Sequence, residues 1–137
     1  MTDADLDRIE SALALKLPVF YRRFMLDYPR WLPEKQPDWS DVEKWELPND
    51  PDRVIRFNRY VRGFEPGEFF DDGPWPEHYF AIGSERDQNW YFLDLASGSE
   101  VVFLFHHEEG EVRREAESLA EFPAALVGWW ENVKADS

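Results

Sequence analysis

The apolar positions at the start of the chain predict an amphipathic helix. Leu6, Ile9 and Leu13 recur at the spacing that places side chains on one face of a helix. Thr2 and Asp5 precede these apolar positions. They stand three residues apart, which is the spacing of a capping box. We therefore expect a first helix that begins after Thr2 and continues to about residue 15.

Proline and glycine positions predict two further helices. Pro18 suits the first turn of a second helix that Pro29 stops, because proline lacks the backbone donor that a helix interior needs. Asp50 and Pro51 suit the cap and the first position of a third helix, which Gly63 ends. The segment between these two helices is rich in proline, tryptophan and acids and is expected to be irregular. The expected apolar faces comprise Phe20, Tyr21, Phe24, Met25 and Tyr28 in the second helix and Val54, Phe57, Val61 and Phe64 in the third.

Three apolar segments in the second half of the chain predict consecutive strands. Residues 79–82, 90–95 and 101–105 are rich in β-branched and aromatic side chains and lie between turn signals. A short segment centred on Gly98 separates the second strand from the third and suits a hairpin loop. The pattern therefore favours antiparallel pairing in the centre of a sheet.

The C-terminal residues predict a last helix. Ser118 and Glu121 form another capping box, and an apolar stripe with helical spacing follows them. Pro123 would remove an early backbone bond from a helix that began at Ser118, which favours a start nearer Phe122. Together the elements predict a single α+β domain over residues 1–137. Its central sheet, antiparallel or mixed, is expected to be flanked by the N-terminal, middle and C-terminal helices.

Composition agrees with one folded domain in a reducing compartment. The chain has 137 residues, of which 43% are hydrophobic, and a domain of that size can bury enough surface to fold. It has no cysteine, which excludes disulfides and thiolate zinc sites. The first residues are acidic where a signal peptide is basic, and no apolar run approaches the roughly 20 residues that span a bilayer. We expect a cytoplasmic protein that does not enter a membrane.

The net charge of the chain restricts its partners. Fifteen Lys and Arg against 29 Asp and Glu give a net charge of −14, which repels phosphate backbones and anionic lipid headgroups. A basic protein is the complementary ligand, since opposite charge speeds encounter. The alternative is that the acidity serves only solubility.

Three segments of the chain together resemble one known family. They are IESALALKLPVFYRRFM, HYFAIGSERDQNWYFLDL and VVFLFHHEE, and their order resembles that of the SUKH superfamily, which includes a fungal cell-wall synthesis regulator and many bacterial immunity proteins. The resemblance implies an α+β domain with a cupped protein-binding surface. The matching positions with an expected structural role are Ile9, Leu17, Pro18, Tyr21, Phe24, Ile82, Tyr91, Leu93 and Asp94.

Two functions are consistent with this resemblance. Small acidic members usually protect a bacterium from a protein toxin, so the resemblance implies an immunity protein that covers the active site of a basic, often nucleic-acid-cleaving, toxin. The alternative is a regulatory or scaffolding module bound to a host protein. A toxin gene beside this one would favour the first function, and an isolated gene the second. Neither function requires a cofactor, a metal, a nucleic acid or a small-molecule substrate.

Tryptophans and acids in the expected loops are the candidate partner contacts. Large amphipathic rings act either as packed lids or as binding anchors, and an acidic rim around such anchors would suit a basic partner. The candidate contacts are Trp31, Trp39, Asp71, Asp72, Trp75, Glu85, Asp87, Trp90, His107, Glu108 and Glu109. A secondary candidate is a basic stripe on the third helix, made of Arg53, Arg56, Arg59 and Arg62, which would otherwise be a solvated face.

Catalytic and metal chemistry find little support in the sequence. No nucleophile elbow or phosphate loop is present, so no catalytic residue is assigned. His106 and His107 are adjacent and would point to opposite faces of a strand, which disfavours a shared metal. A small hydrolase that uses residues 106–109 remains a third hypothesis, and it predicts a stoichiometric metal. Asp94 inside a strand is either a buried acid with a raised pKa or a local cap.

Overall fold

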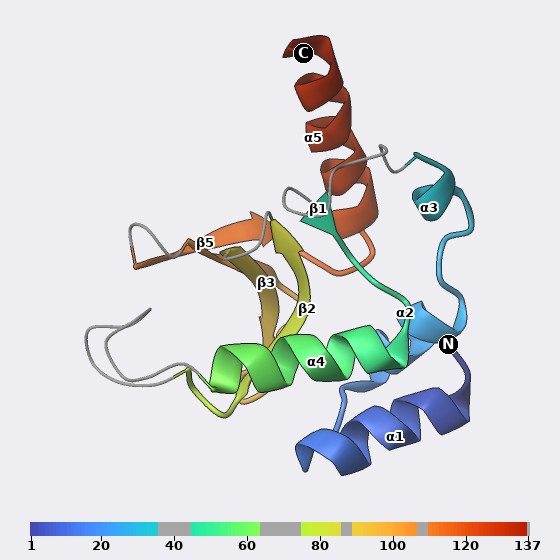
Figure 1. Ribbon diagram of the computed structural model, residues 1–137, viewed down its shortest axis with the longest axis vertical. Helices are drawn as coiled ribbons and strands as arrows, with labels where there is room; N and C mark the ends of the chain where they lie inside the picture. The colour runs from blue at the N-terminus through green and yellow to red at the C-terminus, as the bar shows by residue number, and fades with distance from the viewer. Residues whose placement is uncertain (36–44, 64–74, 86–88, 107–109, 137) are drawn as a thin grey trace.

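The computed structural model describes residues 1–35, 45–63, 75–85, 89–106 and 110–136. These residues form helices and an antiparallel sheet whose strands follow the chain order β1-β2-β3-β4-β5 (Figure 1). The predicted α+β class is confirmed. The elements are α1 (Asp3–Leu13), α2 (Val19–Leu26), α3 (Trp31–Lys35), β1 (Trp45–Glu46), α4 (Pro51–Arg62), β2 (Tyr79–Glu85), β3 (Asn89–Asp94), β4 (Val102–His106), β5 (Glu111–Ala116) and α5 (Phe122–Asp136).

Capping residues begin the helices where the sequence predicts. Thr2 and Asp5 form the predicted capping box of α1. Asp50 accepts a hydrogen bond from the backbone of Asp52 at the start of α4, and Pro51 is its first residue. α5 begins at Phe122, next to Pro123, as the proline argument favours. Pro18 differs slightly, because it caps α2 from outside the helix.

The sequence does not predict α3, β1 or β5. β1 has two residues, and most of β5 is exposed and charged, so neither carries the alternating pattern of a half-buried strand. Both lie at the edges of the sheet, where pairing with a neighbouring strand rather than burial defines the strand. The predicted turn from Ser40 to Glu43 lies outside the described residues.

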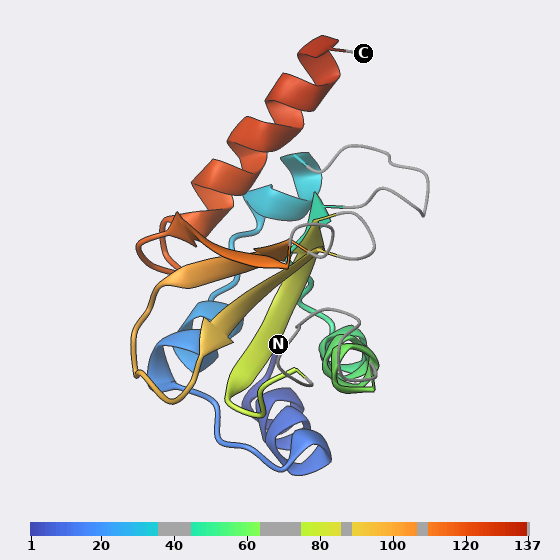
Figure 2. The same ribbon diagram turned by 90° about the vertical axis from the view of Figure 1, so that its left-hand side faces the viewer.

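The sheet separates two clusters of buried side chains. On one face, α1, α2 and α5 pack on Phe80, Ile82 and Leu93, and the first residues of α4 join this cluster. On the other face, the C-terminal half of α4 packs with Phe92 and Phe105. Figure 2 shows the curved sheet with α4 on one side and α2 on the other, and α5 projecting from one end. Among the described helices, none combines the length and apolar character that a bilayer span needs.

The side chain of Asn58 joins α4 to the edge of β2. Asn58 is fully buried, and its amide donates to the carbonyl of Ala81 and accepts from the N–H of Ala81, both at 2.8 Å. It also donates to Val54 within α4 at 2.9 Å. β2 has an irregular register at this point, between Ala81 and Gly83. The Asn58 amide therefore pairs the backbone N–H and C=O of Ala81, which β1 is too short to reach.

Gly83 lets β1 approach β2. A Cβ built on Gly83 would lie 2.2 Å from the backbone oxygen of Glu46, so any other residue would push β1 away from the sheet. The backbone carbonyl of Leu47, next to β1, accepts a hydrogen bond from the Tyr28 hydroxyl. The short first strand is therefore held by close backbone packing and by the end of the α2 segment.

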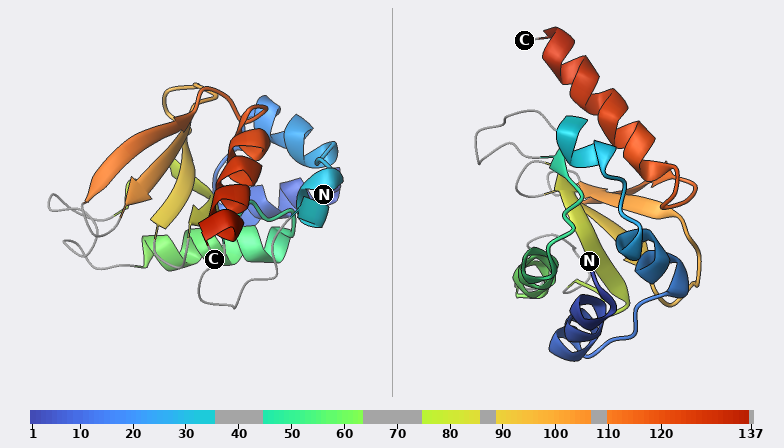
Figure 3. Two further views of the ribbon diagram at one scale, coloured as in Figure 1. Left: turned by 90° about the horizontal axis from the view of Figure 1, so that it is seen from above. Right: turned by 90° about the vertical axis from the view of Figure 1, so that its right-hand side faces the viewer.

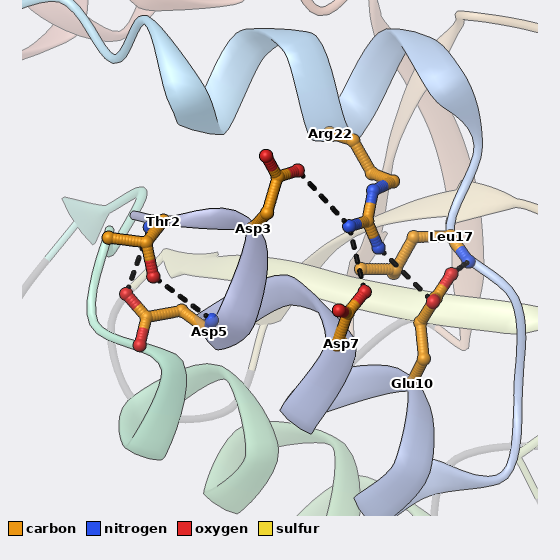
Figure 4. Close-up of polar contacts among 7 residues, drawn as sticks. All are labelled: Thr2, Asp3, Asp5, Asp7, Glu10, Leu17 and Arg22. Atoms are coloured by element: carbon orange, nitrogen blue, oxygen red, sulfur yellow. Dashed lines mark hydrogen bonds and ion pairs between the residues drawn. The ribbon is translucent and has the colours of Figure 1, made fainter.

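A network of charges fixes α1 against α2 (Figure 4). The guanidinium of Arg22 in α2 lies 3.3 Å from Asp3, 2.9 Å from Asp7 and 3.1 Å from Glu10, all three in or at the face of α1. The carboxylate of Glu10 also accepts a hydrogen bond from the backbone N–H of Leu17 at 2.7 Å. One arginine thus neutralises part of the acidity of α1 and orients the linker that leads to Pro18.

Replacing Asn58 by alanine is expected to lower the free energy of unfolding by about 2–3 kcal/mol, because both backbone groups of Ala81 would be buried without a partner. Chemical denaturation measures this loss. Asn49→Ala, at an exposed position, is the matched control and should change stability by less than about 0.5 kcal/mol. Equal losses in the two variants would contradict the role of Asn58.

Candidate functional site

Two of the tryptophans predicted as partner contacts are packing residues. Trp75 is 4% exposed and Trp90 is 3% exposed. The ring of Trp75 meets Phe92 edge to face with centroids 5.3 Å apart, and Trp90 meets Phe57 in the same way at 5.2 Å. These rings fill the second hydrophobic cluster because the sheet face beneath α4 is itself aromatic. Trp75 and Trp90 are therefore packed lids, one of the two roles that the sequence leaves open for them.

The other predicted contacts are partly or fully exposed, or they lie outside the described residues. Trp31 in α3 is 45% exposed, and Glu85 at the end of β2 is half-buried. The remaining candidates lie outside the described residues and stay predictions. They are Trp39, Asp71, Asp72, Asp87, His107, Glu108 and Glu109.

The basic stripe of α4 is only partly a free surface. Arg53 bonds to the carboxylate of Glu46 in β1, with Nε 2.8 Å from the oxygen. Arg62 donates to the backbone oxygens of Leu13 and Glu77 at 3.4 and 3.3 Å, and burial lowers its pKa. These two arginines therefore attach α4 to its neighbours. The other members, Arg56 and Arg59, are exposed.

Asp94 acts as a local cap in the described part of the chain. Its carboxylate accepts a hydrogen bond from the backbone of Ala96 at 3.0 Å and lies 3.9 Å from His78. The carboxylate is half-buried at the turn after β3. Among the described residues, no group of three metal-ligating side chains comes together.

A groove runs along α2, where the sequence predicts only helix packing. Tyr21 and Met25 are buried as expected, but Phe20 and Phe24 are half-buried and line a hollow of about 810 Å³. A second hollow of about 320 Å³ shares Pro18, Val19, Phe20 and Gly98 with the first, so the two are neighbours. The turn between β3 and β4 forms the opposite wall, with Gly98 at φ +67°. The periodicity of α2 did not distinguish residues that face the core from residues that face this groove.

The rim of this groove carries exposed apolar and charged side chains. Val19 is 63% exposed and Leu26 is 46% exposed on the outer face of α2. Arg23, Asp27 and Glu100 line the same hollow. An apolar floor with a charged rim is the usual composition of a protein-binding surface.

The charge of one glutamate on the sheet acts on another. Glu115 in β5 is half-buried, and burial followed by the negative charge of Glu85 raises its pKa above the ordinary value, while Arg113 lowers it by less. Glu85 lies on β2, three strands away in the sheet order. The sequence predicts Glu85 as a contact and gives no sign of Glu115, because no local pattern connects them.

The fold defines the class of protein as an antiparallel sheet with helices packed on both faces and a groove along α2. The chain matches the model of the SMI1 / KNR4 family (SUKH-1) over residues 1–124. It belongs to this family, and the resemblance found in the sequence is confirmed. No curated protein and no solved structure matches the chain.

Replacing Glu115 by glutamine is expected to stabilise the protein at pH 7, by less than about 1 kcal/mol because the group is half-exposed. A raised folded-state pKa means that the folded protein binds the extra proton, so the native state loses stability as pH rises from the unfolded pKa through the folded pKa. The variant escapes this loss. Its advantage in thermal unfolding should therefore vanish below the ordinary glutamate pKa of about 4.3.

The control is Glu117→Gln, since Glu117 is exposed and lies 3.2 Å from Arg114. This variant should show no stabilisation at pH 7. An unchanged or lower melting temperature of Glu115→Gln at pH 7 would contradict the raised pKa of Glu115.

Proposed function

We propose that this chain is an immunity protein that binds a basic protein toxin in the cytoplasm and blocks the toxin's active site without catalysing a reaction. Membership of the SMI1 / KNR4 family over residues 1–124 carries the proposal. The net charge of −14 supports a partner of opposite sign. An acidic protein that covers a basic active site would also exclude a polyanionic substrate from it.

The groove along α2 supports binding to a protein rather than to a small ligand. Its two neighbouring hollows lie along a helix that also exposes Val19 and Leu26. Trp31 follows shortly after Pro29, which lines the groove. Exposed apolar side chains beside a shallow groove supply the desolvated centre that most protein interfaces require.

Charge and apolar contact would contribute to different steps of binding. Long-range attraction between an acidic chain and a basic partner raises the rate of encounter, and it weakens as salt screens the charges. Apolar contact at the groove acts only at short range and slows dissociation. Together they would give a stoichiometric complex that persists while it covers the partner's site.

Co-expression with the product of the adjacent gene tests the proposal. We expect the chain to rescue cells from that product's lethality and to co-purify with it at 1:1 stoichiometry. The association rate should fall by about tenfold or more between 50 and 500 mM NaCl, because screening removes the attraction. Absence of both rescue and complex would overturn the proposal. Capture of a host protein by a chain whose gene stands alone would favour the regulatory or scaffolding alternative.

A further inference from the structure

The last strand of the sheet has one open edge. β5 ends the strand order of the described sheet and pairs there with β4 alone. The view from above in Figure 3 shows β5 along the outer margin of the sheet. β1, at the opposite margin, has two residues, whereas β5 has six, and residues 111–114 are all exposed. Such an edge presents backbone N–H and C=O groups with which a further strand can pair.

The charge of β5 differs from the charge of the chain as a whole. The strand Glu111–Ala116 contains two arginines and two glutamates and is therefore neutral. The whole chain has a net charge of −14, so two copies repel one another where their acidic surfaces approach. Two copies can meet at β5 with a lower electrostatic cost.

Two-fold symmetry restricts how two β5 strands can pair. An axis perpendicular to the sheet makes the strands antiparallel and leaves each side chain on its own face, so the axis passes between one residue and its copy. With Val112 at the axis, Glu111 of one copy is opposite Arg113 of the other, and the reverse pair forms as well. With Glu111, Arg113 or Arg114 at the axis, that charged side chain would be opposite its own copy, which destabilises a strand pair. Within residues 111–114, which pair with β4 without a register shift, the charge pattern therefore selects Val112.

This register arranges the charges of one face in alternation. Glu111 and Arg113 lie on the same face of β5, and their side chains form an ion pair at 3.2 Å. Opposite residues of paired strands have Cβ atoms about 5 Å apart. Each Arg113 would therefore lie between Glu111 of its own chain and Glu111 of the copy, and a guanidinium has donors for both carboxylates. The existing ion pair is kept and a new one is added to it.

The other face of β5 gains an apolar contact in the same register. Val112 is 40% exposed, although its side chain is apolar and β-branched. It pairs with Phe105 of β4, which belongs to the second hydrophobic cluster. The two Val112 side chains would lie against one another and would continue the apolar face of each sheet across the axis.

We propose that β5 is a self-association edge, at which two copies of this chain pair antiparallel around Val112 and join their sheets into one. The partner that this surface fits is a second copy, because the charge pattern of the strand is complementary to itself. The pairing is independent of the proposed function, since no residue of β5 lines the groove along α2.

Cysteine cross-linking tests the register, because the chain has no cysteine of its own. In the Val112→Cys variant the two thiols would be opposite one another, with Cα atoms about 4.5–5.5 Å apart, a separation that a disulfide can bridge. We expect mild oxidation to link this variant into dimers about tenfold faster, or more, than the Arg114→Cys variant. Arg114 is exposed on the same strand, but its copy would lie about 13 Å away along the strand direction. Equal rates in the two variants would overturn the proposal.

Charge exchange tests the contacts in the absence of a cross-link. Glu111→Arg and Arg113→Glu should each weaken dimerisation by about tenfold or more in sedimentation measurements, because each places like charges opposite one another. The variant with both changes restores opposite charges and should recover the dimer. The matched control is Arg114→Glu, which alters the net charge as Arg113→Glu does but faces Gly110 of the copy, and it should dimerise as the wild type does.

A wild-type chain that stays monomeric up to about 1 mM would overturn the proposal. So would a double variant that folds but does not recover the dimer. If the backbone amides of β5 are protected from hydrogen exchange only in a complex with another protein, the edge belongs to that partner and self-pairing is wrong.

Discussion

The hydrogen bonds between the Asn58 side chain and the backbone of Ala81 are the constraint on which the arrangement of this domain depends. β1 pairs with β2 only at its far end, so the middle of β2 would otherwise be a buried edge with unpaired polar groups. One amide supplies both the donor and the acceptor. Because that amide belongs to α4, the helix is fixed along the sheet edge, and α1 packs beside it (Figure 1).

Fixing α4 at the edge determines which surfaces remain for binding. The second half of α4 covers the aromatic face of the sheet and encloses Trp75 and Trp90. The opposite face is covered by α1, α2 and α5, but a groove remains beside Val19 and Phe20. This groove is lined by α2 and by the turn after β3.

The acidity of the chain has two structural roles. Near the helices it is partly neutralised, since Arg22 lies against three carboxylates of α1 (Figure 4) and Arg53 bonds to Glu46. These contacts connect elements of the fold. On the sheet, burial followed by the negative charge of Glu85 raises the pKa of Glu115. A basic partner would neutralise such a negative charge, which lowers the stability of the folded protein.

The sequence by itself determined the elements whose information is local. Capping residues and apolar periodicity predicted α1, α4 and α5, alternation and turn residues predicted β2, β3 and β4, and the motif order predicted the family. Only the tertiary structure decided the rest. β1 and β5 exist through pairing with a neighbour, Trp75 and Trp90 are buried by a helix distant in sequence, and the charge of Glu85 acts on Glu115 from another strand. The physical reason is that pairing, enclosure and charge proximity depend on distances in space, which a local pattern of residues does not contain.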